Sequence, residues 1–137
     1  IAPGDFDGDG RTDYAIFRPA DGTWHFLLKG LNYSTRQFGS AGDIPVAGDF
    51  NGDGKADIAV FRPSNGVWYI ANSDSRGTFT FVQFGAAGDK PVPADYDGDG
   101  KTDIAVYRPA GGVWYVLKSS DGSFTANSFG IETDLPA

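Results

Sequence analysis

The sequence contains no cysteine and no methionine, and only one of its 18 acidic residues, Glu132, is a glutamate. The absence of cysteine excludes a disulfide scaffold and any thiol chemistry. No apolar run approaches the roughly 18 residues that a membrane-spanning helix needs. The chain has 137 residues, which is enough for one modest domain with a hydrophobic core.

The composition that remains favours turns and strands. The formal net charge of −7 argues against a nucleic-acid partner, because binding to phosphates needs a basic face. Asp favours turns and compact metal loops, whereas acids that solvate helices are usually Glu. Aromatic residues make up 15% of the chain, with 20 glycines and 8 prolines, so the sequence predicts a turn-rich all-β protein.

A nine-residue acidic segment occurs three times, at residues 5–13, 49–57 and 95–103, with spacings of 44 and 46 residues. An apolar segment ending in Arg-Pro follows each copy, and then a Gly-x-Trp triplet and a closing Phe-Gly pair. The repeat covers residues 1–137 with no linker between units. We therefore expect a single repeat domain made of three units.

The middle unit shows the strand pattern most clearly. Its expected strands lie at residues 45–47, 58–62, 67–71 and 78–84, with turns at 64–66 and 74–77. The segment 58–62 is almost wholly apolar, which is typical of a strand buried on both faces. Four short strands in about 45 residues predict a blade of a β-propeller. The expected fold is all-β, with three four-stranded antiparallel blades that are part of a larger propeller or assemble into one.

The acidic segments have the spacing of a calcium loop. Counted from the first Asp, positions 1, 3, 5 and 9 carry Asp or Asn, and positions 4 and 6 carry Gly. Calcium takes about six to eight oxygen ligands, and alternate residues of a tight loop can direct oxygens at one centre. Position 7 would contribute its backbone carbonyl. The predicted ligands are Asp5, Asp7, Asp9, Arg11, Asp13, Asp49, Asn51, Asp53, Lys55, Asp57, Asp95, Asp97, Asp99, Lys101 and Asp103, with Arg11, Lys55 and Lys101 binding through the backbone.

These loops are not EF-hands, because Ile16, Val60 and Val106 stand where an EF-hand has its bidentate Glu. One Asp-Gly-rich segment could be a plain turn, but three copies in register favour a metal site. Three Ca²⁺ ions would bring the charge of −7 to about −1. The middle site is expected to be the weakest, since Asn51 replaces an Asp, and the calcium is expected to be mainly structural.

The loops and the segment Phe84-Gly85-Ala86-Ala87-Gly88 resemble the FG-GAP/VCBS repeats of integrin α-chain propellers and bacterial surface proteins. The resemblance implies four-stranded blades, Ca²⁺ in an inter-strand loop, and adhesion or ligand binding outside the cell or at its surface. Integrin-like propellers resemble seven-bladed rings, and three blades cannot close a ring. In the repeat, residues 135–137 align with residues 44–46, and the first residues of the chain align with those that follow. The end of one copy would therefore continue in register into the start of another. The alternatives are a longer array, head-to-tail closure of copies, and an open filament.

Three further sets of residues recur or stand alone. Trp24, Trp68 and Trp114 are expected to pack between blades rather than to bind sugars. We expect Arg18, Arg62 and Arg108 to pair with the repeated acids Asp43, Asp89 and Asp134. His25 has no counterpart in the other units, and no nucleophile–base set stands out, so no enzymatic activity is expected.

The sequence is compatible with three functions. The first is a calcium-stabilised adhesion or recognition module with a protein or glycan ligand. The second is a lectin with one weak sugar site in each blade. The third is an accessory propeller of a secreted polysaccharide-degrading enzyme.

Overall fold

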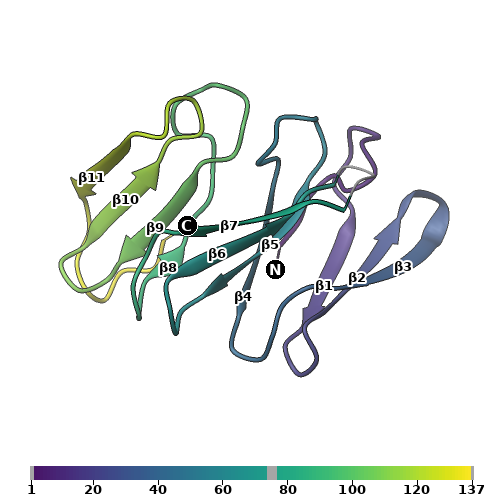
Figure 1. Ribbon diagram of the computed structural model, residues 1–137, viewed down its shortest axis with the longest axis horizontal. Coiled ribbons are helices and arrows are strands. Elements are labelled where there is room, and N and C mark those ends of the chain that lie inside the picture. The colour runs from purple at the N-terminus through teal and green to yellow at the C-terminus, as the bar shows by residue number, and fades with distance from the viewer. Residues whose placement is uncertain (1, 74–76, 137) are drawn as a thin grey trace.

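The computed structural model describes residues 2–73 and 77–136, and it contains three antiparallel sheets that follow one another along the chain (Figure 1). The first sheet comprises β1 (Tyr14–Arg18), β2 (Thr23–Leu28) and β3 (Asn32–Gln37). The second comprises β4 (Ile44–Gly48), β5 (Asp57–Arg62), β6 (Val67–Ala71) and β7 (Phe79–Gln83). The third comprises β8 (Lys90–Pro91), β9 (Ile104–Arg108), β10 (Val113–Leu117) and β11 (Phe124–Ser128).

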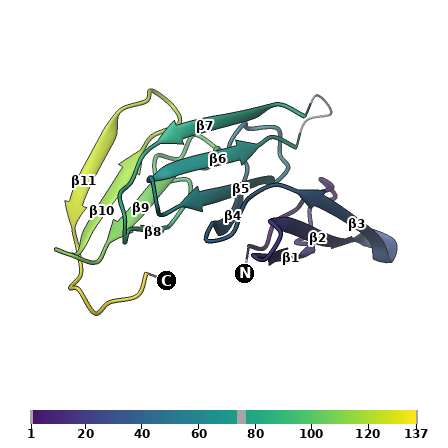
Figure 2. The same ribbon diagram turned by 60° about the horizontal axis from the view of Figure 1, so that its bottom comes forward.

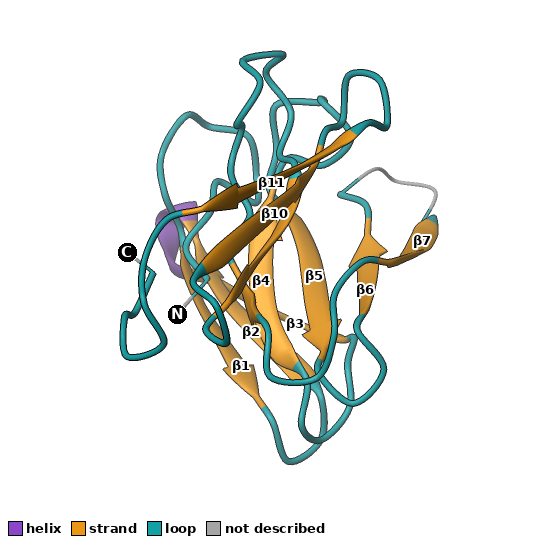
Figure 3. Ribbon diagram, turned by 90° about the vertical axis from the view of Figure 1, so that its left-hand side faces the viewer, coloured by secondary structure: helices purple, strands orange, loops and turns teal. Residues whose placement is uncertain are grey.

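Spatial order within each sheet follows chain order, and every neighbouring pair is antiparallel. Figure 2 shows β7 and β11 along the outer rim, and β4 and β8 on the side where both ends of the chain lie. Loops gather at both ends of the strands (Figure 3). Within the described residues the one helical element is a short 3₁₀ turn, η1 (Lys29–Leu31), and no helix is long and apolar enough to cross a membrane.

The prediction of an all-β chain with four strands in the middle unit is confirmed. The expected turn at 74–77 falls mostly outside the described residues. The prediction of four strands in the first unit is wrong, since its sheet has three. Here Ala2, Pro3 and Gly4 align with the second half of β4, and this short segment makes a single bridge, from Gly4 to Asp13, instead of a ladder.

The core consists of two layers, one on each side of the second sheet. Ile58 and Val60 of β5 pack against Trp24 and Phe26 of the first sheet. On the other side of this sheet, Phe61, Trp68 and Ile70 pack against Ile104 and Val106 of β9. The strand β5 is therefore buried on both faces, as its apolar sequence predicts.

The packing role expected for the tryptophans is confirmed for Trp24 and Trp68, which are both fully buried. Their indole N–H groups donate to the carbonyls of Phe38 and Phe84 at 3.0 and 2.8 Å, which satisfies the buried polar atom. Trp114 makes the same bond to Phe129 but is only partly buried, because no further sheet among residues 2–73 and 77–136 covers it.

Two of the expected arginine–aspartate pairs form. Arg62 contacts Asp43 at 2.7 Å and Arg108 contacts Asp89 at 2.8 Å, each through two nitrogens. Each of these acids is buried and lies just before the first strand of its sheet. The expectation that Arg18 also pairs with one of the repeated acids is wrong for the described residues. Arg18 approaches Asp21 at 4.0 Å instead, and Asp134 accepts a hydrogen bond from the N–H of Ile131.

Candidate metal centres

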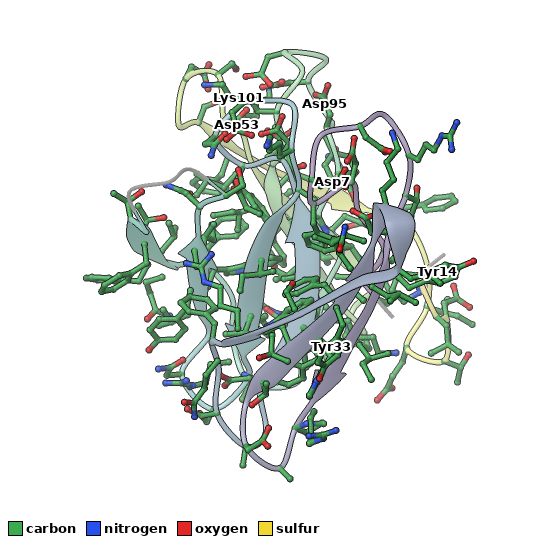
Figure 4. The ribbon with its side chains drawn as sticks, turned by 90° about the vertical axis from the view of Figure 1, so that its right-hand side faces the viewer. Asp7, Tyr14, Tyr33, Asp53, Asp95 and Lys101 are labelled. Atoms are coloured by element: carbon green, nitrogen blue, oxygen red, sulfur yellow. The ribbon has the colours of Figure 1, made fainter. Side chains whose placement is uncertain are left out.

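The three acidic loops lie at the same end of the molecule, at the starts of β1, β5 and β9. Figure 4 shows Asp7, Asp53 and Asp95 together at this end, whereas Tyr14 projects from the side of the first sheet. The arrangement follows from the repeat, because each loop occupies the same place relative to its own sheet.

The first Asp of each loop folds the loop around its own carboxylate. Asp5 Oδ1 accepts the N–H groups of Gly8 and Asp9 at 2.7 and 3.1 Å, and its Oδ2 accepts that of Gly10 at 2.7 Å. Burial raises the pKa of Asp5. The N–H groups and the positive charge of Lys55 lower it by a larger amount, so the pKa lies below its ordinary value. Gly8 and Gly10 have φ values of 80° and 84°, which a residue with a side chain rarely adopts.

In two loops, three carboxylates converge on one point. Oxygens of Asp5, Asp7 and Asp13 lie within 4.8 Å of one another in the first loop, and the same holds for a second trio in the third loop. The members of that second trio are Asp95, Asp97 and Asp99. Two ligands of one Ca²⁺ ion, each about 2.4 Å from it, can be at most about 4.8 Å apart. The donor set and spacing therefore fit a hard divalent cation.

The middle loop differs because position 3 is an amide. Asn51 Nδ2 donates to Asp53 Oδ2 at 3.2 Å and to Asp57 Oδ1 at 3.3 Å. Asn51 Oδ1 still accepts the N–H of Asp53, as the Asp at position 3 does in the other two loops. The backbone turn is therefore retained, but an uncharged donor now contacts two of the three carboxylates of the loop.

The Asp at position 9 ties the start of each loop to its end. Asp13 Oδ2 accepts the N–H of Phe6 at 2.9 Å, and equivalent bonds reach Asp57 from Phe50 and Asp103 from Tyr96. All three carboxylates are buried. Burial raises the pKa of Asp57, against the opposing effect of the Ser73 N–H.

The predicted ligands are thus brought together to different degrees. Asp13 lies with the first trio, whereas Asp103 lies outside the second. For position 7, the structure shows that the N–H groups of Arg11, Lys55 and Lys101 donate to the Asp at position 5, at 3.1, 2.9 and 2.8 Å. The backbone N–H of position 7 is therefore held against the Asp at position 5 in all three loops.

Sequence reasoning missed the residues beside the loops. The hydroxyl groups of Ser73 and Ser119 donate to Asp53 Oδ2 and Asp99 Oδ2, both at 2.7 Å. These hydroxyls are the main cause of the lowered pKa values of Asp53 and Asp99. Both serines lie five residues after the tryptophan of their unit. An alignment of the three copies beyond the acidic segment could have found this position.

Neighbouring loops are also joined to each other. The carbonyl of Asp5 accepts the N–H of Ala56, and the carbonyl of Asp49 accepts that of Thr102, both at 2.7 Å. Ala56 and Thr102 directly precede the buried Asp at position 9 of the next loop. The loops thus connect adjacent sheets.

The family comparison agrees with this repeat. The model of the FG-GAP-like repeat matches residues 5–60 and 49–106, so each match runs from one acidic loop through the next. No curated protein matches the chain. The two matches together extend over residues 5–106, and the chain therefore belongs to the FG-GAP-like repeat family.

Proposed function

We propose that the chain is a calcium-binding β-propeller module of an extracellular or cell-surface protein, with one Ca²⁺ ion in each acidic loop and three in all. Its three sheets would be consecutive blades, and its role would be adhesion or recognition of a protein or glycan ligand, without catalysis. The observation that supports this proposal best is the convergence of three carboxylates within 4.8 Å in the first and third loops.

The ions would act mainly by stabilising the loops. Each loop crowds three or four carboxylates together, and a ligand that binds only the folded state stabilises it by RT ln(1 + [L]/Kd). With a Kd of roughly 10⁻⁴–10⁻³ M, as is common for extracellular modules, millimolar calcium would give about 0.4–1.4 kcal/mol at each site. Three sites would contribute about 1–4 kcal/mol, which is a large part of the stability of a typical domain.

Direct metal analysis tests this proposal. After dialysis against trace calcium, we expect about three Ca²⁺ ions per chain, and a count near zero would refute it. Asp97→Asn should weaken the third site because a ligand charge is lost. Asp21→Asn is the matched control, since Asp21 caps its own turn through the N–H of Thr23 and lies between β1 and β2, at the opposite end of these strands from the acidic loop. Equal effects of the two variants would contradict the assignment of the loops.

Chelation distinguishes a structural ion from one that bridges to a ligand. Treatment with EDTA should lower the melting temperature, and ligand binding should be lost together with the fold. If EDTA abolished ligand binding at a temperature where the metal-free chain remained folded, calcium would contact the ligand directly.

Two alternative roles are less well supported. A lectin that used the tryptophans would need exposed rings, but Trp24 and Trp68 are fully buried, which leaves Trp114 as the one partly open ring of the three. Binding to a glycan array that is lost on Trp114→Ala would favour the lectin. A catalytic domain in the same polypeptide would favour an accessory module of a polysaccharide-degrading enzyme.

Head-to-tail self-association remains part of the proposal. Ile16 on β1 is 64% exposed, whereas its counterparts Val60 and Val106 are 1% exposed because each packs on the preceding sheet. Within the chain, Trp68 of the second sheet belongs to the layer that covers Val106 of the third. In the same way, the face of the third sheet that carries Trp114 could cover Ile16 of a second copy. The mass in solution with calcium, measured by light scattering, tests this. A monomer at all concentrations would refute it.

A further inference from the structure

One position beside the acidic loops differs among the three units. The residue five places after the tryptophan is Lys29 in the first unit, Ser73 in the second and Ser119 in the third. The hydroxyl groups of the two serines, which are uncharged, donate a hydrogen bond to Oδ2 of the Asp at position 5. In the first unit the ammonium group of Lys29 takes this place, at 3.1 Å from Asp9 Oδ2.

The turn η1 fixes the backbone of Lys29. It begins at Lys29 directly after β2, and the side-chain amide of Asn32 donates to the Lys29 carbonyl at 2.8 Å. Asp9 is well covered, with 16% of its side chain exposed, while 67% of the Lys29 side chain is exposed. The lysine thus reaches in from solvent and covers one side of the first loop.

The buried Asp at position 9 is affected as well. The backbone N–H of each serine donates to this Asp, from Ser73 to Asp57 and from Ser119 to Asp103. Across the described part of the chain, the structure shows no such bond from Lys29 to Asp13. It is Asp13 that joins the trio in the first loop, whereas position 5 joins it in the third loop.

A second lysine adds to the difference between the loops. The Lys55 side chain lies over Gly8, so close that a Cβ atom at Gly8 would meet its Cε at 2.8 Å, and the Lys101 side chain lies over Gly52 in the same way. At Gly98 of the third loop, no described atom lies within 4 Å of the corresponding point. The first loop therefore has two lysines of the chain beside it, the second has one, and the third has none in this position.

We propose that Lys29 is a built-in counter-ion of the first loop, so that this loop binds calcium more weakly than the third loop, which is the main calcium site. The inference rests on the proposed calcium function. The first and third loops have the same four aspartates, so ligand count does not separate them. The charge of Lys29 does separate them, because this ammonium group lies 3.1 Å from Asp9 Oδ2 and would repel a divalent ion bound to that carboxylate.

The exposure of the Lys29 side chain limits how strongly it weakens calcium binding. An exposed ion pair is worth little by itself, because the lysine can move into solvent. Its charge nevertheless stays within about one Debye length of the ion, so the repulsion is reduced but not removed. We expect Lys29 to weaken calcium binding to the first loop on the order of tenfold.

A reciprocal exchange tests the inference. Lys29→Ser gives the first loop the serine of the third, and Ser119→Lys gives the third loop the lysine of the first. Lys90→Ser is the matched control, because it removes the same charge from β8, where Lys90 pairs with Tyr107 at the end of β9 far from the loop. Circular dichroism confirms that each variant is folded.

Calcium titration of ¹⁵N-labelled protein resolves the sites. The N–H groups of Gly10, Gly54 and Gly100 each donate to the first Asp of their own loop, so each reports on one site. Lys29→Ser should tighten the site reported by Gly10 about tenfold, and Ser119→Lys should weaken the site reported by Gly100 about tenfold. Lys90→Ser should change neither by more than about twofold.

The outcomes are distinguishable. If the wild-type chain binds calcium but Lys29→Ser changes the Gly10 titration no more than Lys90→Ser does, the inference is overturned and the calcium function stands. If no loop of the wild-type chain binds calcium and Lys29→Ser gains no site, the proposed function itself fails.

Discussion

Replacing Val60 and Ile16 by alanine tests how the sheets pack. Both residues occupy the same place in the repeat, but Val60 is 1% exposed in the core layer with Trp24, whereas Ile16 is 64% exposed. Val60→Ala removes two buried carbons, each worth about 0.8 kcal/mol, and leaves a small cavity. We expect a loss of about 2 kcal/mol in the free energy of unfolding. Ile16→Ala removes three carbons that are mostly in water already, and should cost less than about 1 kcal/mol.

The melting temperature reports this difference. With an unfolding entropy of roughly 2.1 cal/mol/K per residue, 2 kcal/mol corresponds to a fall of about 7 °C for a chain of this length. Calorimetry at millimolar calcium and low protein concentration is the assay. If Ile16→Ala lowered the melting temperature of the monomer as much as Val60→Ala, the exposed face of β1 would be covered within the chain and the reasoning refuted. Repeating the scan at several protein concentrations would show whether a second copy covers this face.

Three further changes have defined outcomes. Asn51→Asp should tighten the middle calcium site, because a fourth carboxylate is added; an unchanged calcium isotherm would contradict this. Arg108→Met should cost about 2 kcal/mol in denaturant unfolding, because it leaves the carboxylate of Asp89, which is 3% exposed, without its partner. Ser119→Ala should raise the pKa of Asp99 towards its ordinary value in the metal-free protein, measured by NMR titration. Since the pKa of Asp99 is lowered in the folded state, its contribution to stability is present above the unfolded pKa of about 4 and is lost as the pH falls through the folded value. As the pH falls, Ser119→Ala should therefore lose less stability than the wild-type protein does.

Much of the fold could be predicted because strands in this chain are short apolar runs between turn residues. The run from Ile58 to Phe61 has no polar position, and the structure buries it on both faces between two sheets. The same reasoning failed at Arg18. Arg62 and Arg108 pair with an acid that lies just before the first strand of their own sheet, and the first sheet lacks that strand. A repeat predicts an interaction only where both partners are present.

The candidate site was predictable in its ligands but not in its surroundings. Asp5, Asp7 and Asp13 are close in sequence, so the spacing alone indicates that they can meet. The lysine that contacts Asp9 comes from the end of β2, 20 residues further along the chain, and reaches the loop only because β1 and β2 pair in register. Antiparallel pairing brings the end of the second strand of a hairpin back to the start of the first.

That pairing explains why three loops with one ligand pattern need not bind calcium equally. In every unit the hairpin returns the same position to the acidic loop, but the side chain at this position differs among the three units. A serine there adds a neutral hydrogen bond to the loop, whereas Lys29 adds a positive charge. Calcium affinity depends on the charge of the ligands and of their neighbours. Part of the electrostatic difference between the first and third loops therefore arises outside the ligand motif, at a position that the paired strands bring to the loop.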